Sequence, residues 1–170
     1  MTLYPYVGPR EVRQHAMNTA RFQIRVASDV ALWAQTQQTK QHEALWATFV
    51  VDSNGELWVA DRRSEHIGCS RGEPVRAAGE LAFVLNSNGA EVVETTNQST
   101  GFCPAVESWG ALECALKRAG IVHPDAWTTA FEFRRCLNCQ ATNIVKDGWL
   151  VCAQCDADLP LEWNFHAVQK

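Results

Sequence analysis

Four cysteines near the C-terminus constrain this chain more than any other feature of its sequence. They form two Cys-x-x-Cys pairs, separated by twelve residues. Two residues between cysteines let both thiolates of a tight turn face one ion, and two such turns supply four sulfur ligands in the tetrahedral arrangement that Zn²⁺ favours. The spacing therefore predicts one zinc ion bound by Cys136, Cys139, Cys152 and Cys155.

The residues between the two pairs predict a β-hairpin. Residues 143–146 and 149–151 flank Asp147-Gly148, a dipeptide typical of tight hairpin turns. A knuckle, a hairpin and a second knuckle in this order resemble a zinc ribbon. Because four thiolates leave no open coordination position, we expect a structural ion rather than a catalytic one. Without it, residues 134–166 are expected to lose their fold.

The composition is that of a globular protein. Of the 170 residues, 46% are hydrophobic and 20% are charged, which is enough apolar material for a buried core. The cysteines number seven, and the first residues lack the basic start and apolar stretch of a secretory signal. These features disfavour a secreted disulfide framework. No apolar run is long enough to span a bilayer, so we expect a soluble, cytoplasmic protein.

Two Asn-Gly dipeptides, at positions 54–55 and 88–89, predict tight turns ahead of the ribbon. The strands expected on either side of them are residues 47–52, 57–60, 81–85 and 91–94. We expect these four strands to form an antiparallel β-meander at the centre of the fold. With flanking helices and the C-terminal zinc ribbon, the predicted fold class is α+β.

Three helices are expected around this sheet. The first follows Pro9 and covers residues 11–17, and the second opens at Ser28-Asp29, a favourable N-cap pair. The polar run 35–41 is expected to be a helix end or an exposed linker. The third helix, residues 106–119, carries an apolar stripe and is followed by glycine, which commonly ends helices.

A further strand, residues 128–134, is expected to lead directly into the ribbon. The chain is therefore expected to consist of an α+β domain, residues 1–133, and a zinc ribbon packed on it, residues 134–170. The ribbon contains three aromatic candidates for partner binding, because aromatic anchors are typical of protein interfaces. These candidates are Trp149, Trp163 and Phe165, and the alternative is that they only pack the ribbon onto the domain.

The middle of the chain carries a gapped motif ahead of a predicted helix, with its residues in the order His66, Gly72, Val75, Ala78-Gly79-Glu80, Ser99 and Pro104. This order resembles a domain of bacterial toxin-associated proteins, which is also similar to the segment after the IQ motif in plant calmodulin-binding proteins. In that family the motif begins His-Ser-Ser and ends Ser-Gly-His-Tyr-x-Pro. Here the serines and the His-Tyr pair are replaced by Ile67, Gly68, Gly101 and Phe102. The resemblance implies a bacterial toxin, immunity or defence system. No IQ motif is present, so calmodulin binding is not implied.

An enzyme is the second hypothesis. Long loops on a rigid scaffold often carry function, and residues 62–74 and 96–104 are two such loops that can lie at one end of the sheet. A small hydrolase or transferase would use His66 and Glu80 with Ser99 or Cys103, and thiol catalysis could also use Cys69. The sequence lacks the signatures of zinc deaminases and of phosphate-binding loops.

Nucleic acid is a disfavoured partner. The net charge is −4 at pH 7, and acidic side chains outnumber basic ones around the ribbon aromatics, whereas binding by stacking needs interleaved cations. A weaker nucleic-acid alternative would use the N-terminal arginines Arg10, Arg13, Arg21 and Arg25. The first hypothesis is therefore a non-enzymatic protein-interaction module that contains a zinc ribbon.

Overall fold

The computed structural model describes residues 2–15, 18–37, 44–87 and 89–165. A five-stranded sheet and a two-stranded sheet carry the fold, together with four short α-helices and a 3₁₀ turn, within these residues. No helix in these ranges is long and apolar enough to cross a bilayer. In chain order the elements are α1 (Arg10–His15), β1 (Arg21–Ile24), α2 (Ala27–Ala34), β2 (Leu45–Val51), β3 (Leu57–Asp61), α3 (His66–Cys69), β4 (Ala77–Asn86), β5 (Gly89–Thr96), η2 (Val106–Ser108), α4 (Trp109–Ala119), β6 (Glu132–Arg135) and β7 (Thr142–Val145).

The larger sheet is antiparallel throughout and has the order β1-β3-β2-β4-β5. The predicted α+β class, the antiparallel sheet and both hairpins are confirmed. The order is not that of a simple meander, however, because β4 pairs with β2 and not with β3. The outer edge of β3 is taken by β1, a strand that the sequence analysis did not predict. The connection through residues 62–76, which contains α3, therefore crosses to the free edge of β2.

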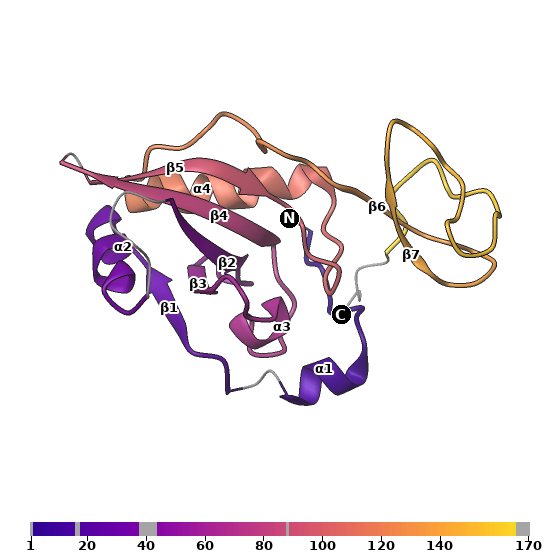
Figure 1. The fold of residues 1–170 in the computed structure, drawn as a ribbon, viewed down its shortest axis with the longest axis horizontal. Helices are drawn as coiled ribbons and strands as arrows, with labels where there is room; N and C mark the ends of the chain where they lie inside the picture. The colour runs from indigo at the N-terminus through magenta and orange to yellow at the C-terminus, as the bar shows by residue number, and fades with distance from the viewer. Residues whose placement is uncertain (1, 16–17, 38–43, 88, 166–170) are drawn as a thin grey trace.

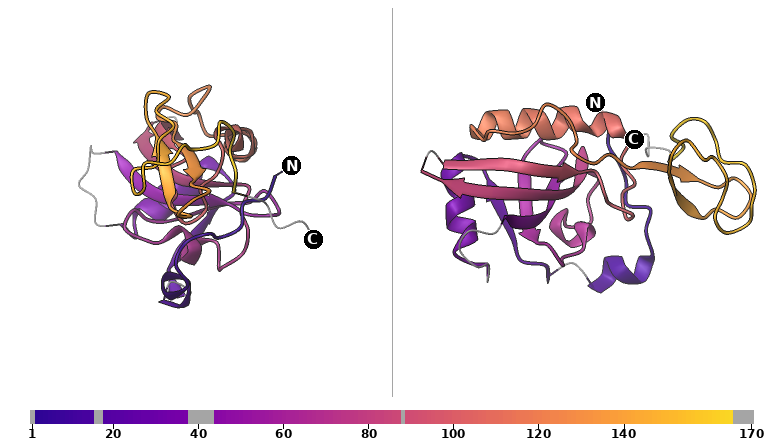
Figure 2. Two further views of the ribbon diagram at one scale, coloured as in Figure 1. Left: turned by 90° about the vertical axis from the view of Figure 1, so that its right-hand side faces the viewer. Right: turned by 45° about the horizontal axis from the view of Figure 1, so that its top comes forward.

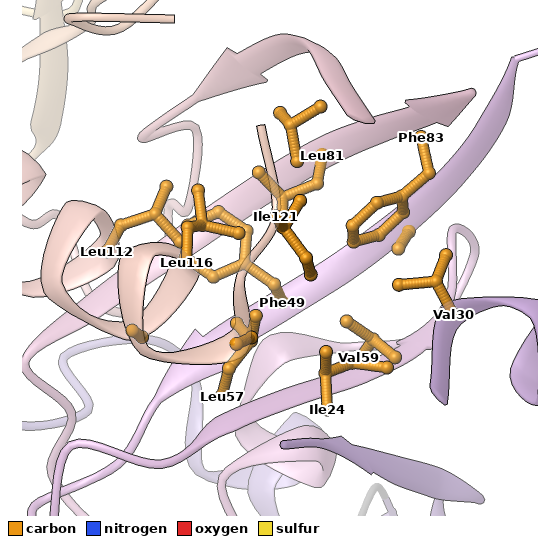
Figure 3. Packing of buried hydrophobic residues seen from close by; sticks show 14 of the residues in the cluster. Ile24, Val30, Phe49, Leu57, Val59, Leu81, Phe83, Leu112, Leu116 and Ile121 are labelled. Carbon is orange, nitrogen blue, oxygen red and sulfur yellow. The ribbon is translucent and has the colours of Figure 1, made fainter. Parts of the chain in front are cut away.

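Helices α2 and α4 cover one face of this sheet, as Figure 1 shows. Leu112 and Leu116 of α4 and Val30 of α2 meet Phe49 of β2 and Phe83 of β4 in the main core (Figure 3). The opposite face of the sheet is covered by α3 and by the N-terminal segment. Because both faces of β2 are buried, this strand has an almost unbroken run of apolar and β-branched residues.

All three predicted helices differ in their boundaries from the observed ones. α2 begins at Ala27 rather than after Ser28-Asp29, and its N-cap is Val26. Asp29 still caps the helix, because its Oδ2 accepts the backbone N–H groups of Arg25 and Val26 at 2.8 and 3.1 Å from inside the first turn. The predicted third helix is split into the short η2 turn and α4, which ends at Gly120 with φ 67°.

α1 starts one residue earlier than predicted, at Arg10. The end of that predicted helix, residues 16–17, lies outside the described residues. Most of the predicted polar run at 35–41 also lies outside the described residues. Its first residues form a turn that closes α2, with the Thr36 N–H 2.9 Å from the carbonyl oxygen of Trp33.

The segment from α4 to the ribbon runs alongside β5. The predicted strand 128–134 is observed only as β6, four residues long, at Glu132–Arg135. Before β6, side chains make part of the hydrogen bonding to the neighbouring segment. Thr128 Oγ1 accepts the Thr95 N–H at 2.8 Å, and the buried side chain of Asn97 bonds both the N–H and the carbonyl oxygen of Phe131. These bonds direct the chain from the edge of the main sheet into the ribbon.

The ribbon lies at the end of the molecule opposite α2 (Figures 1 and 2). The chain after the second cysteine pair returns to the main domain through Trp163 and Phe165. The Trp163 ring meets Tyr4 edge-on at 5.4 Å, and Phe165 is buried with Phe133 and Cys103. Aromatic contacts thus join the ribbon to the body of the molecule.

Candidate metal centre

Two turns of the same shape present the four cysteines. In the first, Cys136 accepts a hydrogen bond from the Gln140 N–H at 3.0 Å and donates its own N–H to Ala141 at 2.9 Å. The second turn repeats both bonds over residues 152–157, at 3.0 and 2.8 Å. Each turn therefore forms a closed knuckle whose two thiols share one side.

The residue after each knuckle's second cysteine has a left-handed backbone. Gln140 has φ 62° and Asp156 has φ 57°. This conformation reverses the chain so that the next residue, an alanine in both knuckles, can accept the first cysteine's N–H. The sequence holds this signal as Cys-x-x-Cys-x-Ala in both places, but the sequence analysis did not use it.

The four sulfur atoms converge on one point. All four Sγ atoms lie within 4.8 Å of one another. The closest contacts join different knuckles, with Cys136 to Cys155 and Cys139 to Cys152 both at 3.6 Å. A tetrahedral site with metal–sulfur bonds of about 2.3 Å has sulfur–sulfur edges of roughly 3.8 Å. The arrangement therefore could hold one metal ion, as the spacing predicted.

Polar groups around the site stabilise the thiolate form that metals bind. The Gln154 N–H points at Cys152 Sγ from 3.4 Å, and it is the first cause of a Cys152 pKa lowered to about 6. The pKa of Cys155 is lowered too, first by the side-chain amide of Asn138 at 3.5 Å. The lowered pKa values of Cys152 and Cys155 favour metal binding at neutral pH. The pKa of Cys139, despite a bond from the Ala141 backbone, is raised to about 12 by burial and by the three neighbouring thiols, so this ligand has to lose its proton when the metal binds.

Asn143 links the two knuckles. Its buried side chain donates to Ala141 O at 3.0 Å and to Cys152 Sγ at 3.5 Å, and it accepts the Ala153 N–H at 3.0 Å. One amide thus connects the end of the first knuckle to a ligand of the second. From the sequence, Asn143 is predicted only as part of a strand, because nothing local distinguishes it from an exposed asparagine.

The hairpin predicted between the knuckles is only partly correct. The turn is present, with Asp147 at φ 51°, Gly148 at φ 71° and the Trp149 N–H 2.9 Å from Lys146 O. However, β7 pairs with β6 and not with residues 149–151. Closing the second knuckle brings Leu150 and the residues after it against residues 157–159, which removes them from β7.

The three aromatic candidates occupy different environments. Trp149 is 71% exposed, whereas Phe165 is 1% exposed and lies in a core with Phe133. Trp163 is half-buried, and its Nε1–H donates to Cys103 O at 2.7 Å. Trp149 alone among them presents most of its side chain to solvent.

The enzyme candidates fall into two separate groups. His66 Nε2 lies 2.9 Å from Gly79 O, beside Glu80, and burial lowers the pKa of this imidazole. Ser99 and Cys103 belong to a different loop, whose Cys103 thiol packs in the core with Phe133. Among the described residues, no hydrogen bond joins the two groups.

Neither loop thiol is activated. Burial raises the pKa of Cys103 to about 12, and its Sγ donates to Thr100 O at 3.3 Å. Burial likewise raises the pKa of Cys69 to about 12. A thiol with such a pKa is protonated at neutral pH, so it is a poor nucleophile.

One residue of the family-like motif has a clear packing reason. A Cβ atom at Gly79 would lie 1.9 Å from the carbonyl oxygen of Thr96, so β4 and β5 approach each other there closely enough to require glycine. The glycine of the Ala78-Gly79-Glu80 part of the motif is therefore accounted for by strand packing.

Comparisons with protein-family models, with curated proteins and with solved structures found no match for this chain. They therefore add no support to the toxin-associated resemblance of residues 66–104. What the structure itself defines is an α+β protein whose C-terminal part carries a four-cysteine centre that could hold a metal ion.

Proposed function

We propose that this chain is a protein-interaction module whose C-terminal ribbon is organised by one structural Zn²⁺ ion. The observation that carries the proposal is the convergence of four thiols within 4.8 Å. Zinc suits such a site because it accepts four sulfur ligands in a tetrahedral geometry. With all four positions taken by protein, the ion has no open position for substrate.

Around the knuckles themselves the ribbon has only a small apolar core. Its strands β6 and β7 are four residues each, and the cluster between the knuckles is built on two of the cysteines and Leu159. Such a small apolar core contributes little stability, so metal binding supplies most of the folding free energy of this part.

Metal analysis of protein purified without added metal tests the zinc site. The expected result is about one zinc per chain, lost together with ribbon structure in Cys136→Ser. The matched control is Cys114→Ser, which changes an exposed cysteine outside the site and should retain the metal. Iron at the same stoichiometry, or a folded ribbon without metal, would contradict the proposal.

Trp149 provides the candidate contact with a partner. It borders a hollow of about 620 Å³, whose other apolar walls include Ile144 and Val151. Lys146 is the charged residue of that lining. An exposed tryptophan beside such a hollow is typical of interface anchors. We propose that the partner inserts an apolar side chain here and places a carboxylate near Lys146.

Site-specific photo-crosslinking from position 149 tests this contact. In the native host, a crosslinker at 149 should capture a single protein through a peptide that combines apolar and acidic residues. The control is position 32, where Leu32 is also exposed but lies on α2, away from the ribbon. Equal products from both positions would contradict the proposal. The toxin-associated resemblance makes bacterial toxin, immunity and defence systems the first setting for the search.

A further inference from the structure

A second hollow lies where the ribbon meets the main domain. Its volume is about 430 Å³, and its lining comes from the start of η2, from β6 and from residues 161–163. It shares no lining residue with the hollow beside Trp149. What binds in it is therefore independent of the partner contact proposed for Trp149.

In the apolar lining of this hollow, Trp163 is held in place by contacts with the rest of the molecule, whereas Leu161 is exposed to solvent. The Trp163 ring is held by its hydrogen bond to Cys103 O and by the edge-on contact with Tyr4. Leu161 is 80% exposed, and Val106 completes the apolar lining on the η2 side. An alkyl chain laid here would gain contact with a surface that is already ordered.

The single cation in the lining is fully engaged. The Arg134 side chain is 10% exposed, and it pairs with Glu132 at 3.1 Å. Its guanidinium also donates to the carbonyl oxygens of Phe133, Pro160 and Leu161, at 2.9, 3.1 and 2.8 Å. Arg134 and Glu132 therefore neutralise each other and leave no positive charge for an anionic ligand.

Two other carboxylates of the lining have no ion-pair partner among the described residues. Glu107 on η2 and Glu162 beside Trp163 are both exposed, and neither forms an ion pair within the described part of the chain. They belong to two segments of the lining that are far apart in the sequence. The lining thus combines apolar walls with two uncompensated negative charges, a pattern that attracts cationic ligands and repels phosphate backbones.

We propose that this hollow is a docking groove for a basic segment of another polypeptide. A lysine or arginine side chain of that segment lies with its alkyl stem against Trp163 and Leu161 and its charge between Glu107 and Glu162. Long cationic side chains bury their stems in this way while the charged end meets a carboxylate. An aromatic wall adds attraction for the cation.

Fluorescence anisotropy with a labelled peptide of alternating leucine and arginine, acetyl-(Leu-Arg)₄-amide, tests the groove. The wild-type chain should bind this probe, and the leucine–glutamine analogue should bind weakly. The double variant Glu107→Gln/Glu162→Gln should lose roughly fivefold in affinity or more, since it removes both charge pairs with the probe.

The matched control is Glu73→Gln/Glu94→Gln. It removes the same two charges from exposed glutamates outside the groove, so it should bind like the wild type. Trp149→Ala should also leave binding unchanged, which separates this proposal from the one for Trp149. Equal loss in both double variants would show non-specific attraction to an acidic protein and overturn the groove. Failure of the wild type to bind the arginine probe would overturn it as well.

Discussion

The indole Nε1–H of Trp163 donates to the backbone carbonyl oxygen of Cys103 at 2.7 Å. Trp163 follows the second knuckle, and Cys103 belongs to a main-domain loop sixty residues earlier in the chain. Cys103 itself has φ 45°, a left-handed conformation that is unfavourable for a residue with a side chain. The bond helps to hold that loop in place, so the metal-bearing part and the loop stabilise each other.

Trp163→Phe removes this hydrogen bond and keeps most of the aromatic packing. We expect a loss of about 1–2 kcal/mol in the free energy of unfolding, because the Cys103 carbonyl loses its partner. Urea unfolding measures the loss. Trp149→Phe is the control, since this exposed ring makes no comparable bond among the described contacts, and it should change stability little. Equal effects would contradict the role of the bond.

Removing the metal should unfold the ribbon without unfolding the main sheet. The main core contains Phe49, Phe83 and Leu112 and does not include the cysteine ligands. Hydrogen exchange after chelation should therefore rise over residues 134–165, while β2 and β4 stay protected. Retained protection at both knuckles would contradict the metal-dependent ribbon. Global loss of protection would show that the main core depends on the metal too.

Gly79→Ala should be strongly destabilising. Its Cβ would lie 1.9 Å from Thr96 O, a backbone atom that cannot move without separating β4 from β5. We expect a loss of about 3 kcal/mol or more, or failure to fold. Gly110→Ala in α4 is the control, because nothing lies within 4 Å of its added Cβ. It should raise stability by about 0.5–1 kcal/mol, and thermal unfolding compares the two.

His66 should make stability fall as the pH falls. Burial lowers its pKa in the folded chain, so the unfolded chain binds the proton first. The contribution of the neutral imidazole is complete above its unfolded pKa of about 6.5 and is lost as the pH drops below that value. Urea unfolding at pH 7.5 and 5.5 should show a smaller difference for His66→Gln than for the wild type. If His66→Gln shows the same pH dependence as the wild type, the His66 imidazole is not the source of that dependence.

The parts of the molecule that follow from local sequence were predicted well. The Asn-Gly and Asp-Gly turns need left-handed backbone at fixed positions, and Gly55 and Gly148 have φ 84° and 71°. The spacing of the two cysteines within each knuckle, Cys136 with Cys139 and Cys152 with Cys155, is also a local signal, because only two residues separate them. Such signals survive in any fold, because they depend on neighbours in the chain.

The strand order could not be predicted in this way. β2 and β3 carry the same kind of apolar pattern, so either could receive β4 as a neighbour. The choice depends on β1 covering β3, and β1 is a four-residue strand with little pattern of its own. The strand order was therefore decided by pairing between strands that are distant in the sequence, and by the packing energy of that pairing.

By itself, the sequence determined the α+β class, the two hairpin turns of the main sheet and the four-cysteine centre, because turn chemistry and ligand spacing are local. The tertiary structure decided the rest. It buried Phe165 and the Cys103 thiol but exposed Trp149, and it brought Glu107 and Glu162 to the lining of one hollow. Which aromatic side chain reaches solvent depends on what packs against it, and residues from distant parts of the chain supply that packing.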